Sequence, residues 1–132
     1  MKAMVLRDRQ LAVEEVERPT AGPGEVLARV LACGICGSDL HAAKYMDEMM
    51  ANAQRSGRNA FEDFDGNGIV MGHEFVAEVV ESGPGAESWS AGTRVTSIPV
   101  LVAPQSPNGM LAIGYAAETP GAYGEFVRMS AP

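Results

Sequence analysis

The chain has 132 residues, of which 46% are hydrophobic and 20% charged, and its formal net charge is −7. A chain of this length buries about two-thirds of its unfolded surface in one core, which predicts a single domain. Its acidic balance excludes nucleic-acid binding, which needs clustered Lys and Arg, and its longest apolar run, 98–103, is far below the roughly 20 residues of a membrane span.

The N-terminal segment predicts a β-hairpin, with strands at 3–6 and 11–17 and a polar turn at 7–10. It lacks the long apolar core of a signal peptide. The two cysteines, Cys33 and Cys36, are three positions apart, which favours reduced thiols or metal ligands over a disulfide framework. We therefore expect a cytoplasmic protein with no membrane segment.

A Pro- and Gly-rich turn at 19–24 precedes a predicted strand at 25–33, in which both faces are largely apolar. A strand buried on both faces lies inside a sheet, so we expect this one to be central. After it, Ser38 or Asp39 can cap a helix, and the following residues are good helix formers. The pattern predicts a helix to about Gln54 and then a loop.

Strand patterns return in the second half of the chain, at 75–81, 92–98 and 123–129. The segment 104–120 has three prolines and no clear period, which predicts a long loop. Many short strands with few helices and frequent Gly and Pro turns indicate a mainly β fold, either a barrel or a sandwich.

All Cys and His residues of the chain lie in two short clusters, at 33–41 and 72–74. A catalytic zinc takes about three protein ligands from Cys, His and carboxylate, and Cys36, His73 and Glu74 offer one of each. Neighbouring His73 and Glu74 can both reach a metal, or Glu74 can act from beside the ligands. Zinc in such a site polarises an alcohol or carbonyl oxygen as a Lewis acid.

Two further residues near Cys36 suggest a proton path. Ser38 lies two positions beyond it, and His41 about one helical turn further. A hydroxyl close to the reacting oxygen and an imidazole behind it can carry a proton from substrate to solvent.

The same residues also have simpler interpretations. A single Cys is usually a small buried side chain, a single His is usually a surface or hydrogen-bonded core residue, and a Ser-Asp pair is usually a helix cap. Cys33 and Cys36 form a C-x-x-C that could act in thiol redox chemistry, although no alternating strand-helix pattern comes after it. A structural zinc on Cys33, Cys36, His41 and His73 lacks zinc-finger spacing.

A calcium site is a third alternative. The run Asp63-Phe64-Asp65-Gly66-Asn67-Gly68 followed by Glu74 matches the spacing of an EF-hand loop. An EF-hand needs a helix after the loop, whereas 75–81 is strand-like. The simpler interpretation is a polar turn.

A longer set of motifs runs through nearly the whole chain in a characteristic order. These are Gly34-Ile35-Cys36-Gly37-Ser38-Asp39-Leu40-His41, Gly72-His73-Glu74-Phe75, Glu78-Val79-Val80, Gly83-Pro84-Gly85, Gly92-Thr93-Arg94-Val95 and Gly121-Ala122-Tyr123-Gly124-Glu125-Phe126. Together they closely resemble the N-terminal domain of the zinc-dependent medium-chain dehydrogenases, the group of alcohol, sorbitol and threonine dehydrogenases.

The resemblance implies a GroES-like, partly open β-barrel with a few short helices over residues 1–132. It implies that Cys36 and His73 bind the catalytic zinc, with Glu74 a ligand or a close neighbour. Ser38 would match the hydroxyl that takes the proton of the bound alcohol, and His41 the relay behind it. The full-length enzyme would use NAD or NADP, act on a small alcohol, polyol or carbonyl substrate and form a homo-oligomer.

The chain also departs from the family pattern. The third protein ligand of the family lies beyond the last barrel strand, and the sequence stops at Pro132 before reaching it. No G-x-G-x-x-G of a Rossmann cofactor domain occurs, so we expect this chain alone to be inactive in hydride transfer. The region 99–120 has no cysteine, which predicts no structural zinc. The alternative hypothesis is a non-enzymatic GroES-like binding module.

Overall fold

The computed structural model describes residues 1–57, 68–96, 98–104 and 109–131. In that part of the chain it contains nine strands and one helix. In chain order they are β1 (Lys2–Arg7), β2 (Gln10–Glu15), β3 (Glu25–Cys33), α1 (Gly37–Arg55), β4 (Ile69–Val70), β5 (Phe75–Ser82), β6 (Arg94–Val95), β7 (Val100–Val102), β8 (Met110–Ala112) and β9 (Phe126–Ser130).

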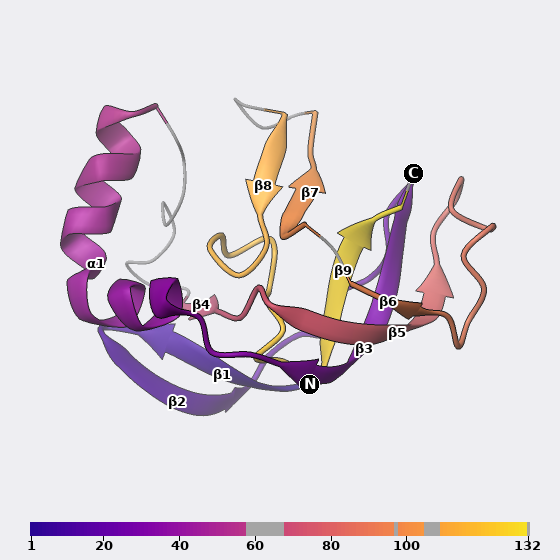
Figure 1. Ribbon diagram of the computed structural model, residues 1–132, viewed down its shortest axis with the longest axis horizontal. Helices are drawn as coiled ribbons and strands as arrows, with labels where there is room; N and C mark the ends of the chain where they lie inside the picture. The colour runs from indigo at the N-terminus through magenta and orange to yellow at the C-terminus, as the bar shows by residue number, and fades with distance from the viewer. Residues whose placement is uncertain (58–67, 97, 105–108, 132) are drawn as a thin grey trace.

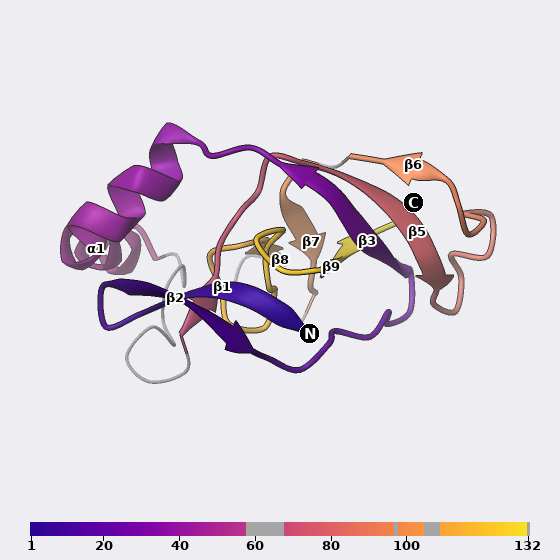
Figure 2. The ribbon, with the colours of Figure 1, turned by 90° about the horizontal axis from the view of Figure 1, so that it is seen from below.

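The strands form three antiparallel sheets, with the orders β2-β1-β4, β6-β5-β3-β9 and β7-β8. Figure 1 shows the four-stranded sheet on one side of the molecule, α1 at the opposite end and the β7-β8 hairpin at the top between them. The sheets stay open and do not close into one continuous ring (Figure 2). The prediction of a mainly β, partly open fold is confirmed.

The prediction that 25–33 is a central strand is also confirmed, because β3 lies between β5 and β9. Its buried residues Val26 and Ala28 pack into the largest apolar core of the molecule. The other buried members of this core are Phe75, Ala77, Val79, Ala86, Leu101, Ile113, Ala122, Val127 and Met129. Both β5 and the β7-β8 hairpin therefore contribute to one interior, in which burial of apolar surface is the main stabilising force.

The segment just before β9 joins the two larger sheets. The carbonyl of Tyr123 accepts a hydrogen bond from the backbone N–H of Met4 (2.9 Å). The N–H of Glu125 donates to the carbonyl of Lys2 (3.2 Å), and its own carbonyl accepts from the N–H of Val30 (2.9 Å). One short stretch thus contacts both β1 and β3.

Helix α1 begins directly after Cys36, which is its N-cap. The prediction that Ser38 or Asp39 is the N-cap is therefore wrong. Asp39 lies at the third helical position, where its carboxylate accepts the N–H of Cys36 (2.9 Å), as in half of a capping box. The helix reaches Arg55, close to the predicted end at Gln54, and bends at Tyr45, whose backbone (φ −125°, ψ 36°) is not helical.

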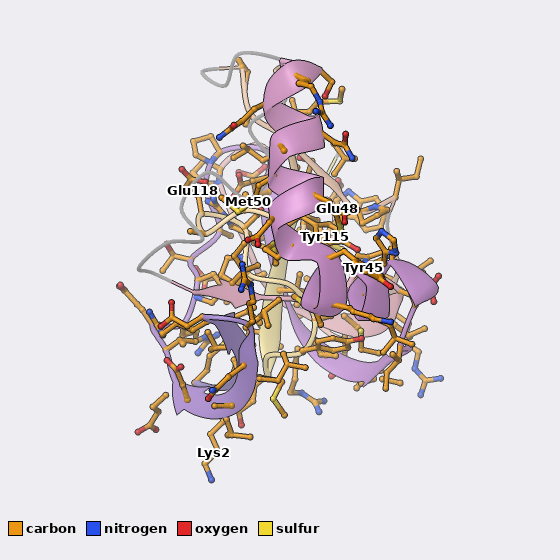
Figure 3. All side chains as sticks on the ribbon, turned by 90° about the vertical axis from the view of Figure 1, so that its left-hand side faces the viewer. Lys2, Tyr45, Glu48, Met50, Tyr115 and Glu118 are labelled. Carbon is orange, nitrogen blue, oxygen red and sulfur yellow. The ribbon has the colours of Figure 1, made fainter. Side chains whose placement is uncertain are left out.

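The first half of α1 covers a second, smaller core. Its buried members are Leu6, Ala42, Met46, Ile69 and Met71, and Tyr115 and Tyr123 pack against them. Figure 3 shows Tyr45 at the bend of the helix and Tyr115 beside it. This small core attaches the start of α1 to β4 and to the residues just after β4.

Three other predictions are corrected. Part of the segment 104–120 is strand β8, which pairs with β7, so it is not one long loop. The strand predicted at 92–98 is only two residues long, and Ser97 lies outside the described residues. The last strand starts at Phe126, because the residues before it make the cross-sheet contacts above.

None of the described helical residues forms a stretch long and apolar enough to cross a membrane.

Candidate metal centre

Three of the predicted ligands meet in space. Cys36 precedes α1, and His73 and Glu74 precede β5, so residues 37 positions apart in the chain become neighbours. One ligand atom from each of the three lies within 4.8 Å of the others. Ligands around one tetrahedral zinc lie roughly 3.3–3.7 Å apart, so small side-chain rotations would close this group on an ion.

The imidazole of His73 is oriented by Asp39. Its Nδ1 lies 3.3 Å from Oδ1 of Asp39, and both atoms are buried without a hydrogen-bond partner among the described residues, so this contact is a close approach and not a hydrogen bond. The Asp39 side chain is only 4% exposed. A carboxylate this close to Nδ1 favours the tautomer with the proton on that nitrogen, which leaves Nε2 with a free lone pair, the form in which imidazole binds a metal.

Asp39 is itself held from two sides. Its Oδ2 accepts the N–H of Cys36 (2.9 Å) and the hydroxyl of Tyr123 (2.9 Å). Burial and this hydrogen bond to Asp39 raise the pKa of Tyr123 well above its usual value, so the hydroxyl keeps its proton and remains a donor. The sequence had suggested only a capping role for Asp39, and Tyr123 only as part of a family motif.

The other side of the His73 ring faces Ser38. The Ser38 hydroxyl lies 3.2 Å from Nε2, the nitrogen that remains for a metal. Tyr115 completes this side, with its ring centroid 5.1 Å from that of His73. Burial raises the pKa of Tyr115, and a hydrogen bond with Ser38 opposes the shift. The Ser38 hydroxyl therefore lies beside one of the candidate ligand atoms.

His41 lies further out. It is exposed and its ring packs against Tyr45, with centroids 4.8 Å apart. The helix places it one turn beyond Ser38 on a neighbouring part of the same face. This position is compatible with the last step of a proton path, between the half-buried Ser38 and solvent.

The other cysteine has a different environment. Cys33 ends β3 opposite Phe75 and packs against the main core. Burial raises the pKa of its thiol, which keeps it protonated and weakly nucleophilic. These properties match the predicted small buried residue better than a redox-active thiol.

The calcium alternative requires a helix after Glu74, and the residues that the structure describes there do not form one. Residues 63–67 of the proposed loop lie outside the described residues, but the segment after Glu74 is strand β5 and not the helix that an EF-hand requires. The backbone carbonyl of Glu74 accepts a hydrogen bond from the N–H of Gly34 (2.7 Å).

A shallow cleft of about 610 Å³ opens beside the ligands. It is lined by Ala32, Gly34, His73, Glu74, Phe75, Val76, Thr96 and Pro99. The cleft gives a small molecule access to the side of the site formed by His73 and Glu74.

The donor set fits a zinc ion. One thiol, one imidazole and one carboxylate are the ligand types of catalytic zinc sites, and the buried carboxylate behind His73 is the partner that ligating histidines usually have. The three ligand residues directly precede a helix and a strand, α1 and β5.

Comparisons with known proteins identify the family of the chain. Residues 22–132 match the family model described as the alcohol dehydrogenase GroES-like domain. The chain is 34% identical over 141 residues to an L-threonine 3-dehydrogenase of Streptomyces avermitilis, covering 99% of this chain and 38% of that protein. It is 36% identical over 94 residues to a (R,R)-butanediol dehydrogenase of Bacillus subtilis, covering 70% of this chain and 26% of that protein.

Solved structures give the same result. A 2R,3R-butanediol dehydrogenase from Bacillus subtilis superposes with a TM-score of 0.70 at 28% identity, covering 98% of this chain and 38% of that one. An alcohol dehydrogenase from Thermus sp. ATN1 gives a TM-score of 0.70 at 27% identity, with 98% and 37% covered. The chain spans 38% of the length of the first of the curated relatives. It belongs to the family of alcohol dehydrogenase GroES-like domains.

Proposed function

We propose that this chain is the metal-binding catalytic domain of an NAD(P)-dependent dehydrogenase of small alcohols or polyols, in which Cys36, His73 and Glu74 hold a zinc ion. The observation that carries the proposal is the meeting of these three ligand types within 4.8 Å, with a buried carboxylate behind the histidine. Membership of the family and the dehydrogenase names of the similar proteins support it.

A zinc ion bound there would supply Lewis-acid polarisation of an alcohol or carbonyl oxygen. The chain's own residues would handle the proton. Ser38, 3.2 Å from Nε2 of His73, would accept the proton of the substrate hydroxyl while giving its own hydroxyl proton to exposed His41, which would release a proton to solvent. Asp39 keeps the His73 ring in place throughout.

Hydride transfer also needs a nicotinamide, for which the G-x-G-x-x-G fingerprint is absent from this sequence. The similar dehydrogenases are more than twice as long as the matched region. We therefore propose that a Rossmann domain outside these 132 residues binds NAD or NADP in the full-length enzyme, and that this chain alone binds metal without transferring hydride.

The first test is metal binding by the chain. After metal removal and reloading, we expect one zinc per chain by elemental analysis, retained against a weak chelator. Cys36→Ser should lose the metal, while Cys33→Ser, the matched control, should retain it. A wild-type chain that folds but binds no zinc would contradict the proposal and favour a non-enzymatic module.

The second test concerns the reaction. The natural gene product should oxidise small secondary alcohols or diols with NAD or NADP, and Ser38→Ala should lower kcat while leaving zinc content unchanged. A zinc-loaded natural protein with no activity on any alcohol, polyol or matching carbonyl compound would contradict the dehydrogenase assignment but not the metal site.

A further inference from the structure

We propose that Tyr123 is a positioning residue of the metal centre, which acts through Asp39 on both His73 and Cys36. This inference rests on the proposed function, because it assumes that those two residues bind a metal. It concerns a hydroxyl group from the last third of the chain that touches none of the three ligand side chains in the described contacts.

The position of Tyr123 is determined by its backbone. Its N–H donates to the carbonyl of Met71 (2.9 Å), two residues before His73, and its carbonyl accepts from Met4 (2.9 Å). Its ring lies against Gly72, where an added Cβ would come within 2.7 Å of Cδ1. The ring therefore has little room to move, and its hydroxyl points at the start of α1.

There the hydroxyl of Tyr123 contacts the carboxylate of Asp39, whose orientation is not fixed by its own side-chain torsions. The terminal torsion of an Asp side chain is broad, so the plane of the carboxylate depends on its partners. On Asp39, Oδ2 has two partners, the N–H of Cys36 and the hydroxyl of Tyr123, each at 2.9 Å. Fixing Oδ2 from two directions fixes Oδ1, which faces Nδ1 of His73 at 3.3 Å.

The same hydroxyl lies 3.3 Å from the carbonyl of Gly34, but this second contact is less important. A hydroxyl has one proton, and a charged acceptor at the shorter distance takes it. Gly34 is exposed, so water can replace a lost contact there, whereas Asp39 is buried and water cannot reach it as easily. Loss of the hydroxyl should therefore change the orientation of the Asp39 carboxylate, and through it the positions of Cys36 and His73.

Tyr123→Phe tests this role, because it removes the hydroxyl and keeps the ring that packs on Gly72. We expect zinc affinity, measured by chelator competition, to fall about tenfold, the lower end of what outer partners of metal ligands contribute. The visible spectrum of the Co(II)-loaded chain should also change, because the geometry of the ligands relaxes. Tyr45→Phe is the matched control, because it removes a hydroxyl from an exposed Tyr at the helix bend. It should leave zinc affinity within twofold of wild type and the cobalt spectrum unchanged.

Two outcomes would overturn the inference. If Tyr123→Phe leaves zinc affinity and the cobalt spectrum unchanged, whatever happens to thermal stability, the Tyr123 hydroxyl does not position the metal centre. If the wild-type chain binds no zinc, the proposed function fails. The positioning role of Tyr123 is then tested separately, by nitrogen NMR of the tautomers of His73 in metal-free protein at fixed pH. In that case the inference requires a smaller share of the Nδ1–H form in Tyr123→Phe than in wild type, and equal shares overturn it.

Discussion

The four-stranded sheet and the junction that holds the candidate ligands are stabilised in different ways. The β6-β5-β3-β9 sheet has regular antiparallel pairing over an apolar core. The junction around Gly72 joins α1, β5 and the segment before β9 through a few buried polar contacts and close backbone packing. Apolar packing tolerates small volume changes, whereas a buried polar network loses its geometry when one partner is removed.

The largest effect is expected from Gly72→Ala. Gly72 has φ +94°, and an added Cβ would lie 2.7 Å from the backbone nitrogen of Tyr123 and 3.0 Å from Sγ of Cys33. Backbone strain and overpacking together should reduce the free energy of unfolding by about 4 kcal/mol. Gly24→Ala is the matched control, because Gly24 has φ +70° with nothing within 4 Å of the added Cβ, and it should cost only about 1 kcal/mol. Equal losses in urea unfolding would show that space at Gly72 is not limiting.

Val127→Ala should give the next largest loss of stability and separate the two regions. Val127 is fully buried in the core of the sheet, so removing two methyl groups should cost about 2 kcal/mol. Val13→Ala, at a 67% exposed strand position, should cost less than about 0.5 kcal/mol. Zinc affinity of the folded chain should stay within twofold in both. A Val127→Ala chain that stays folded but binds zinc tenfold more weakly would show that sheet packing also positions the ligands.

Asp39→Asn should mainly weaken metal binding, whereas Val127→Ala mainly lowers stability. It removes the negative charge that faces Nδ1 of His73, so zinc affinity should fall at least tenfold, about 1.4 kcal/mol. Asp47→Asn makes the same change at an exposed carboxylate of α1 that pairs with Arg9, and it should leave zinc affinity unchanged. The measurement is chelator competition at neutral pH, and unchanged affinity in Asp39→Asn would contradict the orienting role of that carboxylate.

The smallest effect is expected from alkaline pH. The pKa of Tyr123 is raised in the folded chain above its ordinary value of 10 by burial and by Asp39. The folded state then holds its proton more tightly than the unfolded state, so this contribution to stability is complete below about pH 10 and is lost as pH rises further. The free energy of urea unfolding of metal-free protein should fall more steeply from pH 7 to 11 for wild type than for Tyr123→Phe. Parallel curves would show that the hydroxyl is not coupled to a buried anion.

The strand and helix pattern of this protein is largely readable from its sequence. The apolar faces of 25–33 and the helix formers after Cys36 act locally, and the structure confirms the strand and the helix that they predict. Strands β4, β7 and β8 were not predicted, because each has only two or three residues, which become a strand only by pairing: β4 with β1, and β7 with β8. The boundaries of β6 and β9 moved for the same reason, since strand ends depend on partners far away in the sequence.

The residue types of the candidate site were also evident, since Cys36, His73, Glu74 and Ser38 are the chemical groups that a catalytic zinc site uses. Their meeting within 4.8 Å depends on how the start of α1 packs against the start of β5. Asp39 and Tyr123 illustrate the limit: they are 84 positions apart, and their hydrogen bond exists only because β4 and the segment before β9 pair backbone to backbone. The sequence therefore determined which groups are available for chemistry, and the long-range packing decided which of them hold the others in place.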